Sequence, residues 1–554
     1  MLISGLALLV VGALALTTPA HGQEGGTAPA DPRQTVAVEA AIRQAVESLR
    51  LENELTVSNR SIAAVALLPD LYERRGFAPA WVAGADEAVL RALESSAEDG
   101  LDPEDYHRSA LRALRQSLRD PANHRPTTLA GYDLLLSDAV ARFVYHLEFG
   151  KVSARGLDPH WNLTREIDDL DPVEVMQRII ASRSIETEIL DHRPSHPFYR
   201  RGLAALARYR AIAEAGGWEP IPEGPKLERG ATGPRVAALR ARLAATGDLL
   251  RSAGEAFDAM LEQGLEHFQA RHGLDVDGVV GGGTLAALNV PVEQRIEQIR
   301  VNLERARWVL HDLVGDYVLV DIAGFELRLF RDDAMVWMTR VQVGRPYRKT
   351  PVFRSRIRYM DFNPTWTIPP GILRKDTLPA VKRDPSYLSQ RNIRVLDRGG
   401  NEVSASAVDW SRYPAAPFPY RLVQDPGPNN ALGRVKFMFP NEHLVFLHDT
   451  PSRSLFDRSQ RAFSSGCIRV ENPFELARLL LNDPQEWSAE AIARVVDSRE
   501  TRTVQLPEPE LVLLLYWTVD LTREGHVGFK RDLYDRDAPL LAALSQEFAL
   551  HARP

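Results

Sequence analysis

The residues of this chain that could do chemistry gather in one short stretch around Cys467, which is the only cysteine in 554 residues. A lone cysteine cannot form an intramolecular disulfide, and an unpaired thiol in an exported chain points to reactivity. Ser464, Ser465 and Gly466 precede it, and such small residues let the backbone turn and direct N–H groups at an incoming carbonyl. His448 lies far enough upstream for a strand, a loop and a return. The pattern predicts a cysteine nucleophile with a histidine base.

The chemistry that these residues could perform is acyl transfer. A free thiol has a pKa of about 8.5, and a neighbouring imidazolium can lower it to roughly 3.5–7.5. Thiolate attack on an amide gives an oxyanion, for which we expect backbone N–H donors at Gly466 and Cys467. His448 would protonate the leaving amine and later deprotonate an acceptor amine. Neighbouring strand residues point to opposite faces, so we expect a backbone carbonyl, and not Asp449, to orient the imidazole.

Longer motifs around these residues resemble those of a known family. The run from His448 to Ser465-Gly466-Cys467-Ile468-Arg469 resembles the signature of the L,D-transpeptidases with a YkuD-type catalytic domain. Small members carry His-Gly-Cys, whereas Ser465 precedes Gly-Cys here and Arg469 replaces the usual Asn. Both changes are similar to the large, multidomain, periplasmic YcbB-like branch, and they leave His448 as the base. Further matching motifs are Asn363-Pro364-Thr365-Trp366, Pro428-Asn429-Asn430-Ala431-Leu432-Gly433 and Leu447-His448-Asp449-Thr450-Pro451.

The resemblance implies an enzyme that cross-links peptidoglycan through a cysteine acyl-enzyme on a tetrapeptide stem, releases D-Ala and reacts with carbapenems. We assign substrate binding to Arg469, Asn363, Trp366 and Asn430. Asn363 and Trp366 also fit a structural role, and Arg469 either docks a substrate carboxylate or anchors its loop. No cofactor is expected, and no His, Asp and Glu residues have the spacing of a metal site.

Other interpretations of the same residues stay open. A thiol-dependent carboxypeptidase or amidase would hydrolyse stem peptides with the same Cys467 and His448. An inactive wall-binding protein would retain the fold alone, and Cys467 would then be an inert buried thiol.

Composition limits the partners of the chain. Its formal net charge of −7 gives no polybasic reason to bind nucleic acid or an anionic membrane surface. Residues 2–16 form one apolar run that is too short for a comfortable membrane span, and Ala20-His21-Gly22 follows as a small-x-small cleavage pattern. We therefore expect a signal peptide at 1–22 and export to the periplasm, with membrane contact only if this segment stays as an anchor. The expected partners are peptidoglycan stem peptides and other wall-synthesis proteins.

The length predicts three or four domains. A Pro- and Gly-rich linker at 23–35 leads into a helical scaffold domain at 36–225. In its first helix, Val38, Ile42, Val46 and Leu49 share one face. Residues 88–95 and 129–149 repeat the helical pattern, with Gly150 ending the second. This region resembles the scaffold domain of the large L,D-transpeptidases and contains nothing that looks catalytic.

Residues 226–290 resemble a three-helix peptidoglycan-binding module, although a generic three-helix spacer is the alternative. Gly273 is expected to end its second helix, and Thr284 to cap its third. The apolar positions of the first two helices are Val236, Leu239, Leu243, Phe257, Leu261, Leu265 and Phe268. A linker helix at 291–314 is expected to carry many charges opposite the apolar face formed by Val292, Ile296, Ile299, Leu303 and Ala306.

Residues 315–554 predict a mostly-β catalytic domain. A hairpin turns at Asp332-Asp333, and further strands are expected at 357–362, 434–439 and 443–447. His448 then ends a strand, and Cys467 lies on the loop before a helix at 473–481. A strand pair, 511–518 with 527–531, is expected to complete the sheet. We interpret the Pro-punctuated segment 371–428 as an inserted cap over the site. The helical regions and this mostly-β domain together predict a multidomain α+β class.

Overall fold

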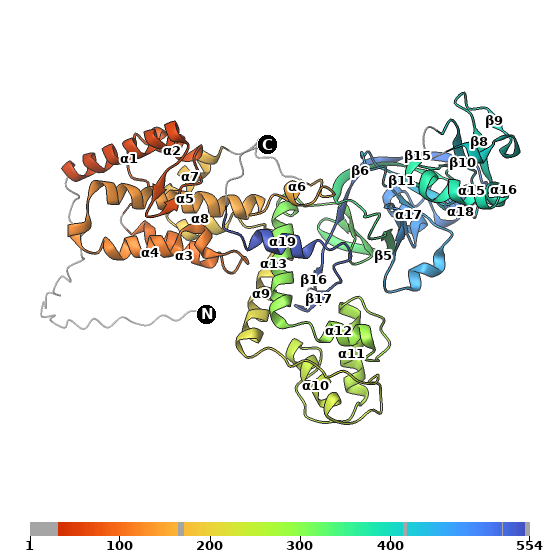
Figure 1. Cartoon of the computed structure of the whole chain (residues 1–554), viewed down its shortest axis with the longest axis horizontal. Coiled ribbons are helices and arrows are strands. Elements are labelled where there is room, and N and C mark those ends of the chain that lie inside the picture. Colours follow the sequence, from red (N-terminus) through yellow and green to blue (C-terminus); the bar gives the residue numbers. More distant parts are fainter. Residues whose placement is uncertain (1–31, 83, 164–170, 414–417, 523, 549–554) are drawn as a thin grey trace, which may run out of the picture.

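The structure is a computed structural model that describes residues 32–82, 84–163, 171–413, 418–522 and 524–548. The predicted signal peptide and most of the predicted linker lie outside these ranges. A helical N-terminal region, a small helical module and a sheet-rich C-terminal region follow one another along the chain (Figure 1). The predicted multidomain α+β class is confirmed. None of the described helices combines the length and the apolarity that crossing a bilayer requires.

The N-terminal region packs its helices around α5 (Pro126–Phe149), which is buried along most of its length. In α1 (Pro32–Glu52) the predicted apolar face is buried, but the helix begins before Val36, so the last residues of the predicted linker are helical. Proline is tolerated in a first helical turn, which explains this earlier start. The other helices are α2 (Leu67–Arg74), α3 (Ala85–Ser95), α4 (Arg108–Ser117), α6 (Ala154–Leu157), α7 (Pro172–Ala181), α8 (Ile185–Leu190) and α9 (Pro197–Glu214).

The small module contains α10 (Pro234–Thr246), α11 (Ala259–Arg271) and α12 (Gly282–Leu288) around a core of its own. Every apolar position predicted for its first two helices is buried. The predicted Thr284 cap is wrong, because α12 begins at Gly282 and Thr284 lies within it. The Thr284 hydroxyl instead accepts a hydrogen bond from Nε2 of Gln269 at 3.3 Å, which ties α12 to α11.

The predicted linker helix exists as α13 (Val292–Val309), and the charged side chains near its C-terminal end are buried. The helix packs against α5, α9 and α19 (Asp537–Leu544), as Figure 1 shows. Glu304, Arg305 and Arg307 are each at most 1% exposed. These charges find partners inside the protein, and one of those partners, Asp537, lies far away in the sequence.

The C-terminal region is built on one sheet with the strand order β13-β5-β14-β12-β11-β6-β15-β3-β4, and β4 also pairs with β5, so the sheet closes on itself. The predicted hairpin turn is present at Asp332 and Asp333, both with positive φ. The strands are β3 (Tyr317–Asp321), β4 (Glu326–Arg331), β5 (Ala334–Gly344), β6 (Phe353–Phe362), β11 (Val435–Met438), β12 (Leu447–His448), β13 (Ala462–Ser464), β14 (Ile468–Val470) and β15 (Arg502–Leu515). Helices α17 (Pro473–Leu481) and α18 (Ala489–Asp497) follow β14.

One predicted strand pairing is wrong. Residues 511–518 and 527–531 do not pair with each other, because β15 lies between β6 and β3 and pairs with β3 in parallel. Strand β17 (Val527–Phe529) instead pairs with β16 (Val519–Leu521) in a separate two-stranded sheet. Parallel pairing joins segments that are distant in sequence, and no local turn pattern reveals it.

The segment predicted as a cap forms a subdomain with its own sheet, β7-β10-β8-β9, and its own core. Strands β7 and β10 pair with each other and form the neck through which the chain enters and leaves. Figure 1 shows this insert projecting from the sheet-rich region. Its elements are β7 (Trp366–Thr367), α14 (Pro370–Ile372), η3 (Leu373–Thr377), α15 (Leu378–Arg383), α16 (Tyr387–Gln390), β8 (Ile393–Leu396), β9 (Glu402–Val403) and β10 (Arg421–Gln424).

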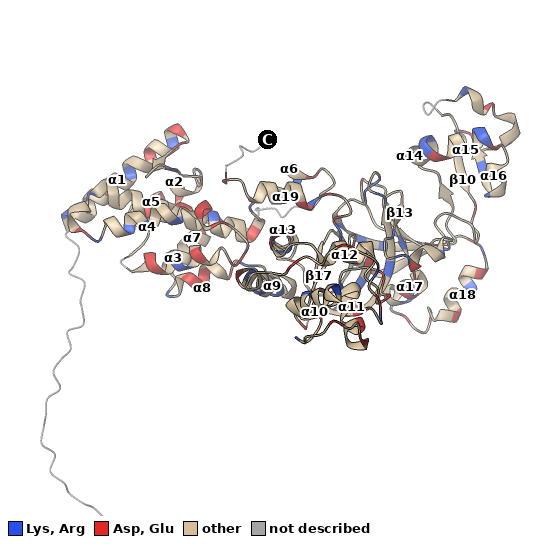
Figure 2. Cartoon of the chain, turned by 60° about the horizontal axis from the view of Figure 1, so that its bottom comes forward, with Lys and Arg blue, Asp and Glu red and all other residues tan. Residues whose placement is uncertain are grey.

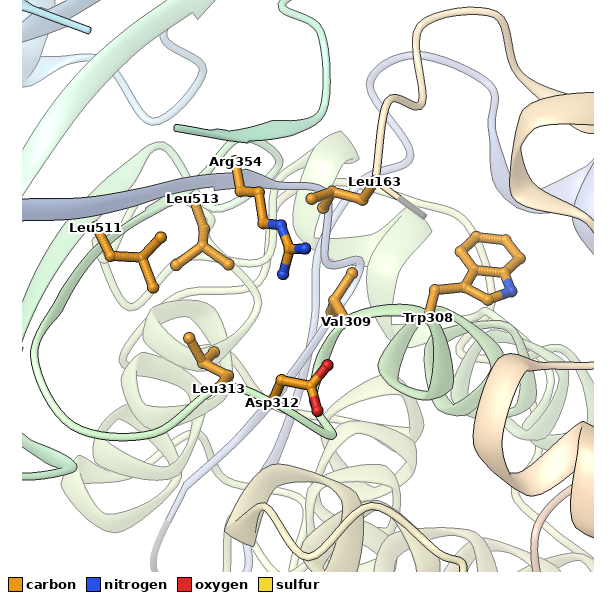
Figure 3. A pocket seen from close by; sticks show the side chains of 8 residues that line it. All are labelled: Leu163, Trp308, Val309, Asp312, Leu313, Arg354, Leu511 and Leu513. Carbon is orange, nitrogen blue, oxygen red and sulfur yellow. The ribbon is translucent and has the colours of Figure 1, made fainter. Parts of the chain in front are cut away.

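A small cavity lies where α13 meets the sheet (Figure 3). Its volume is about 30 Å³, which is room for roughly one water molecule. It is lined by Leu163, Trp308, Val309, Asp312, Leu313, Arg354, Leu511 and Leu513. None of the site residues singled out from the sequence lines this cavity.

Candidate active site

The pairing of β12 with its two neighbours places the candidate residues on one face of the sheet. His448 lies opposite Arg469 in the parallel pairing with β14, and opposite Lys436 in the antiparallel pairing with β11. Paired strand residues project to the same face, so these three side chains form a row across the sheet. Cys467 directly precedes β14, two residues before Arg469, and thus lies beside this row. The structure brings the predicted nucleophile and base onto neighbouring strands.

The loop that carries Cys467 is held by hydrogen bonds on both of its sides. Gly466 has a φ of +122°, which L side chains rarely adopt, so the turn requires glycine. The Gly466 N–H donates to Oγ of Ser464 at 3.0 Å, and this hydroxyl donates to the Cys467 carbonyl at 2.5 Å. Oγ1 of Thr350 donates to the Gly466 carbonyl at 2.8 Å. One of the two expected oxyanion donors, Gly466 N–H, is therefore already engaged, which leaves the N–H of Cys467 as the candidate donor.

The thiol is half-buried and points toward backbone, with Sγ 3.7 Å from the Leu444 carbonyl oxygen. Burial raises the pKa of Cys467, whereas the backbone N–H of Phe446 and the charges of Lys436 and Arg469 act in the opposite direction. The thiolate is thus favoured by two neighbouring cations.

The imidazole of His448 is buried, and its orientation is fixed by backbone. Nδ1 lies 2.5 Å from the carbonyl oxygen of Asp449, so a backbone carbonyl orients the ring, as predicted from the strand geometry. A carbonyl oxygen only accepts, so Nδ1 carries the proton and Nε2 holds the lone pair. Burial lowers the pKa of His448 to about 3, and Arg469 and Lys436 contribute, while the Asp449 carbonyl opposes them. The ring is therefore neutral at neutral pH.

This protonation state corrects the expectation that an imidazolium lowers the pKa of the thiol. The pKa of His448 falls and that of Cys467 rises, so the resting pair is a neutral ring beside a thiol. The physical reason is burial next to two cations, Lys436 and Arg469, which disfavour a third positive charge.

The carboxylate of Asp449 takes no part in orienting the ring. One of its carboxylate oxygens accepts from the Arg434 N–H at 2.9 Å, and the other accepts from Nη2 of Arg453 at 2.7 Å. A Cβ on Gly433 would come within 2.4 Å of the Asp449 side chain, so glycine is needed there. Asp449 therefore stabilises the surrounding loop.

Arg469 and Ser465 connect the nucleophile loop to its surroundings. Nη1 of Arg469 donates to Oε1 of Gln342 at 3.2 Å. Within the described ranges, the buried Nε of Arg469 has no hydrogen-bond acceptor. Oγ of Ser465 accepts from Nη1 of Arg348 at 2.6 Å, and Arg348 also binds both carboxylate oxygens of Asp376 in the insert, at 2.7 and 3.0 Å. The nucleophile loop and the insert are thus joined through one guanidinium.

The two asparagines assigned to substrate binding are engaged within the protein. Nδ2 of Asn363 donates to the carbonyls of Val495 and Glu500, and Asn363 is 2% exposed. Nδ2 of Asn430 donates to the carbonyls of Pro364 and Asp425, both at 3.0 Å, and Oδ1 accepts from the Leu432 N–H. Trp366 lies in β7 and packs against the core of the insert. The structure does not bring these three side chains into the row that contains His448.

Two residues near Cys467 were missed in the sequence. Lys436 alternates with buried Val435 and Phe437 in β11, so the strand period could have placed it on the face of His448. Arg348 lies on the loop between β5 and β6, and no sequence pattern marks it. No group of three or more potential metal ligands occurs in the part of the chain that the structure describes.

Comparison with known proteins identifies the domains. Residues 315–497 match the family profile described as "L,D-transpeptidase catalytic domain", of the YkuD type. Residues 232–288 match a "Putative peptidoglycan binding domain", and residues 66–206 match a "Scaffold domain". The chain therefore contains a YkuD-type L,D-transpeptidase catalytic domain beside a peptidoglycan-binding and a scaffold domain, which confirms the resemblance seen in its motifs.

One curated relative is similar to part of this chain. It is a protein of Haemophilus influenzae named "Putative L,D-transpeptidase", 35% identical over 241 residues. The match covers 44% of this chain and 48% of that protein, so it spans about half the relative's length.

Two solved structures were also found. An L,D-transpeptidase from Xylanimonas cellulosilytica is 17% identical, with a TM-score of 0.18, over 54% of this chain and 100% of that chain. An L,D-transpeptidase from Mycobacterium smegmatis is 12% identical, with a TM-score of 0.16, over 36% of this chain and 59% of that chain.

Proposed function

We propose that this protein is an L,D-transpeptidase that cross-links peptidoglycan through an acyl-enzyme on Cys467. The observation that carries the proposal is the placement of Cys467 beside the strand that holds His448, in a domain of the matching family. The ring of His448 is fixed by the Asp449 carbonyl and keeps a lone pair on Nε2. A fixed base and a thiol on adjacent strands are the parts that nucleophilic acyl transfer requires.

The first half of the reaction forms the acyl-enzyme. The Cys467 sulfur attacks the carbonyl carbon before the terminal D-Ala of a tetrapeptide stem, and the thiol proton passes to Nε2 of His448. The oxyanion that forms accepts a hydrogen bond from the N–H of Cys467. As the C–N bond breaks, His448 returns the proton to the departing nitrogen, and D-Ala leaves as a free amine. A thioester remains on Cys467.

The second half transfers the acyl group to an amine. His448 takes a proton from the acceptor nitrogen, which attacks the thioester carbon. A new C–N bond forms, the C–S bond breaks, and the sulfur leaves with its electron pair. It then regains a proton from His448. An amine acceptor gives a cross-link, whereas water gives a shortened stem.

The insert supports transfer over hydrolysis because it contacts the nucleophile loop through Arg348 and Asp376. A cover that approaches the thioester can exclude water and hold an acceptor. Lys and Arg positions recur on the helical part of this insert (Figure 2), and their exposed side chains suit the free carboxylates of stem peptides. They are Arg374, Lys375, Lys382, Arg383 and Arg391.

The small helical module supports wall attachment. Its family profile is a peptidoglycan-binding one, and binding the wall would raise the local concentration of stem peptides around Cys467. The proposed location of this activity is the periplasm, where the polymer and other wall-synthesis proteins occur. A hydrolytic carboxypeptidase or amidase is the second candidate, because it would use the same residues up to the thioester.

The test is mass spectrometry of the products after incubation of the full chain with purified disaccharide-tetrapeptide. We expect mainly cross-linked dimer, a minor disaccharide-tripeptide product, released D-Ala and a disaccharide-tripeptide adduct on Cys467. A carbapenem should also add to Cys467. If disaccharide-tripeptide is the sole product at every substrate concentration, the chain is a hydrolase and the transferase proposal fails. If Cys467→Ala released D-Ala as the wild type does, the cysteine route would be excluded altogether.

A further inference from the structure

We propose that Lys436, together with Arg469, supplies the positive charge that stabilises Cys467 as a thiolate, while neutral His448 only moves protons. Lys436 is thus a positioning residue that acts through the cysteine. The inference rests on the proposed function, because it concerns the same nucleophile, but its test does not need turnover.

The geometry places Lys436 against the chain that contacts the sulfur. Its ammonium lies 4.0 Å from the centroid of the Phe446 ring, a cation–π contact. The backbone of Phe446 is next to the nucleophile, since its carbonyl accepts from the N–H of Ile468 at 3.0 Å. Lys436 therefore packs on the side chain of a residue whose backbone is hydrogen-bonded to the residue next to Cys467.

The charged groups around this sulfur come from several elements. Lys436 comes from β11, His448 from β12 and Arg469 from β14, and Arg348 reaches the loop through Ser465. On the far side of Lys436, Asp361 of β6 is its partner in the strand register, and the Asp361 carboxylate accepts from Oγ1 of Thr503 at 2.6 Å.

The electrostatics agree with this arrangement. Burial lowers the pKa of Lys436, and the two groups that act against burial are Asp361 and Cys467. A thiolate would therefore stabilise the Lys436 ammonium, and the ammonium stabilises the thiolate by the same amount. Lys436 and Arg469 also lower the pKa of His448. The cations that favour a negative sulfur thus disfavour an imidazolium.

The resulting proton path is balanced. When the S–H bond of Cys467 breaks, the electron pair stays on sulfur, where Lys436 and Arg469 compensate its charge. The proton goes to Nε2 of His448 only in transit, because the same cations repel the imidazolium. His448 then gives this proton to the departing amine and returns to its neutral form. An imidazolium–thiolate pair is not the resting state.

The experiment is alkylation of the full chain with iodoacetamide, followed from pH 5 to pH 10. Cys467 is the only cysteine, so the rate reports this thiol alone. An opposite charge within about 4–6 Å shifts a pKa by roughly 1–3 units. We expect Lys436→Met and Lys436→Gln to raise the apparent pKa of Cys467 by about one unit or more, with roughly tenfold slower alkylation near pH 7.

Three matched variants make the result specific. Lys436→Arg keeps the charge and should restore most of the wild-type profile. Lys226→Met removes an exposed lysine outside the sheet-rich region and should leave the profile unchanged. His448→Ala should leave the apparent pKa of Cys467 near its wild-type value, because the neutral ring contributes no charge to the thiolate.

The proposal is overturned if the Lys436→Met profile matches that of the wild type, or if His448→Ala raises the apparent pKa while Lys436→Met does not. Failure of both neutral variants to fold, judged by circular dichroism, would also overturn it, since Lys436 would then be structural. A Lys436-dependent alkylation profile without any D-Ala release would leave this inference standing and remove the proposed function. The two failures are therefore distinguishable.

Discussion

Two clusters of buried charge in this protein differ in how their charges are balanced. On α13, Arg307 is fully buried and donates to Glu304 at 2.6 and 3.0 Å, to the Asp99 carbonyl at 3.0 Å and to the Tyr199 hydroxyl at 2.9 Å. Burial disfavours its charge, yet Tyr199, Glu304 and Asp99 together raise the pKa of Arg307. This cluster is charge-paired.

Around Cys467 the balance is the reverse. The pKa of each basic group in the row, Lys436, His448 and Arg469, is lowered, with burial as the largest cause. Buried groups whose charges lack full compensation are typical of functional sites, whereas paired groups are typical of structural ones. Both clusters are buried, so what separates the candidate active site from the α13 cluster is its excess of positive charge.

The largest effect is expected from Cys467→Ala. Removal of the nucleophile should lower the rate of D-Ala release by at least about 10⁴-fold, while the melting temperature stays unchanged, because one half-buried sulfur contributes little packing. The measurement is release of D-Ala from disaccharide-tetrapeptide, alongside thermal unfolding by circular dichroism. Retained activity in a folded variant would remove Cys467 from the mechanism.

His448→Ala should follow closely, with a loss of about 10²–10⁴-fold in turnover, the usual contribution of a general acid–base group. The matched control is His443→Ala. His443 lies on the same segment, but its ring packs against Phe353 at 5.3 Å, so turnover should be unaffected. If His443→Ala alone were damaging, the base would have been assigned to the wrong histidine.

Glu304→Gln tests the paired cluster. It would leave the fully buried Arg307 without its carboxylate, and breaking a buried pair typically costs about 3–5 kcal/mol of stability. The control is Glu293→Gln, an exposed residue of the same helix, which should change stability by less than about 0.5 kcal/mol. Thermal unfolding of both variants is the measurement. Equal melting temperatures would mean that the α13 cluster is not paired as described.

The pH dependence of stability tests the charge state of His448. Its pKa is about 3 in the folded protein and about 6.5 in an unfolded chain, so the unfolded state binds more protons between these values. The stability contributed by the neutral ring is present above pH 6.5 and is lost as the pH falls toward 3, by at most about 1.4 kcal/mol per pH unit.

His448→Asn lacks this titration and provides the comparison. The melting temperature of the wild type should fall relative to that of the variant as the pH is lowered from 7 to 4. A constant difference across this range would show that His448 is not held neutral. Other buried histidines, such as His272, act equally in both proteins.

The smallest effect on stability is expected from Lys436→Met. Replacing an incompletely balanced, partly buried cation by an apolar side chain of similar length is often neutral or stabilising, so the change should stay within about 1 kcal/mol. Chemical or thermal unfolding measures it. A loss as large as that of Glu304→Gln would place Lys436 among the paired structural charges and erase the contrast between the two clusters.

Local patterns in the sequence were sufficient to predict most of the helices and strands. The apolar face of α1, the core of the small module, the hairpin at Asp332 and helix α17 all follow from periodicity and turn residues. The candidate nucleophile and base came from residue type and motif, and the carbonyl that orients His448 followed from strand alternation.

What could not be predicted depends on residues that are distant in sequence. The partner of Arg305 is Asp537, and β15 pairs with β3 across nearly two hundred residues, so neither leaves a local mark. The hydrogen bonds that Asn363 and Asn430 donate to backbone carbonyls could not be predicted either, because a motif gives the residue type but not its hydrogen bonds. The charge state of His448 required knowing which cations lie on the adjacent strands.

The return of the C-terminal segment to the scaffold domain has a consequence for the order of folding. Nζ of Lys151 donates to the carbonyls of Leu544 and Gln546, at separations of 393 and 395 residues, and the N–H of Phe548 approaches Asp105. During synthesis, domains generally fold from the N-terminus onward. The scaffold surface around Asp105 and Lys151 is therefore completed only after residues 544–548 have been made. These residues follow the catalytic domain in the sequence, so the scaffold surface is complete only when that domain has been synthesised.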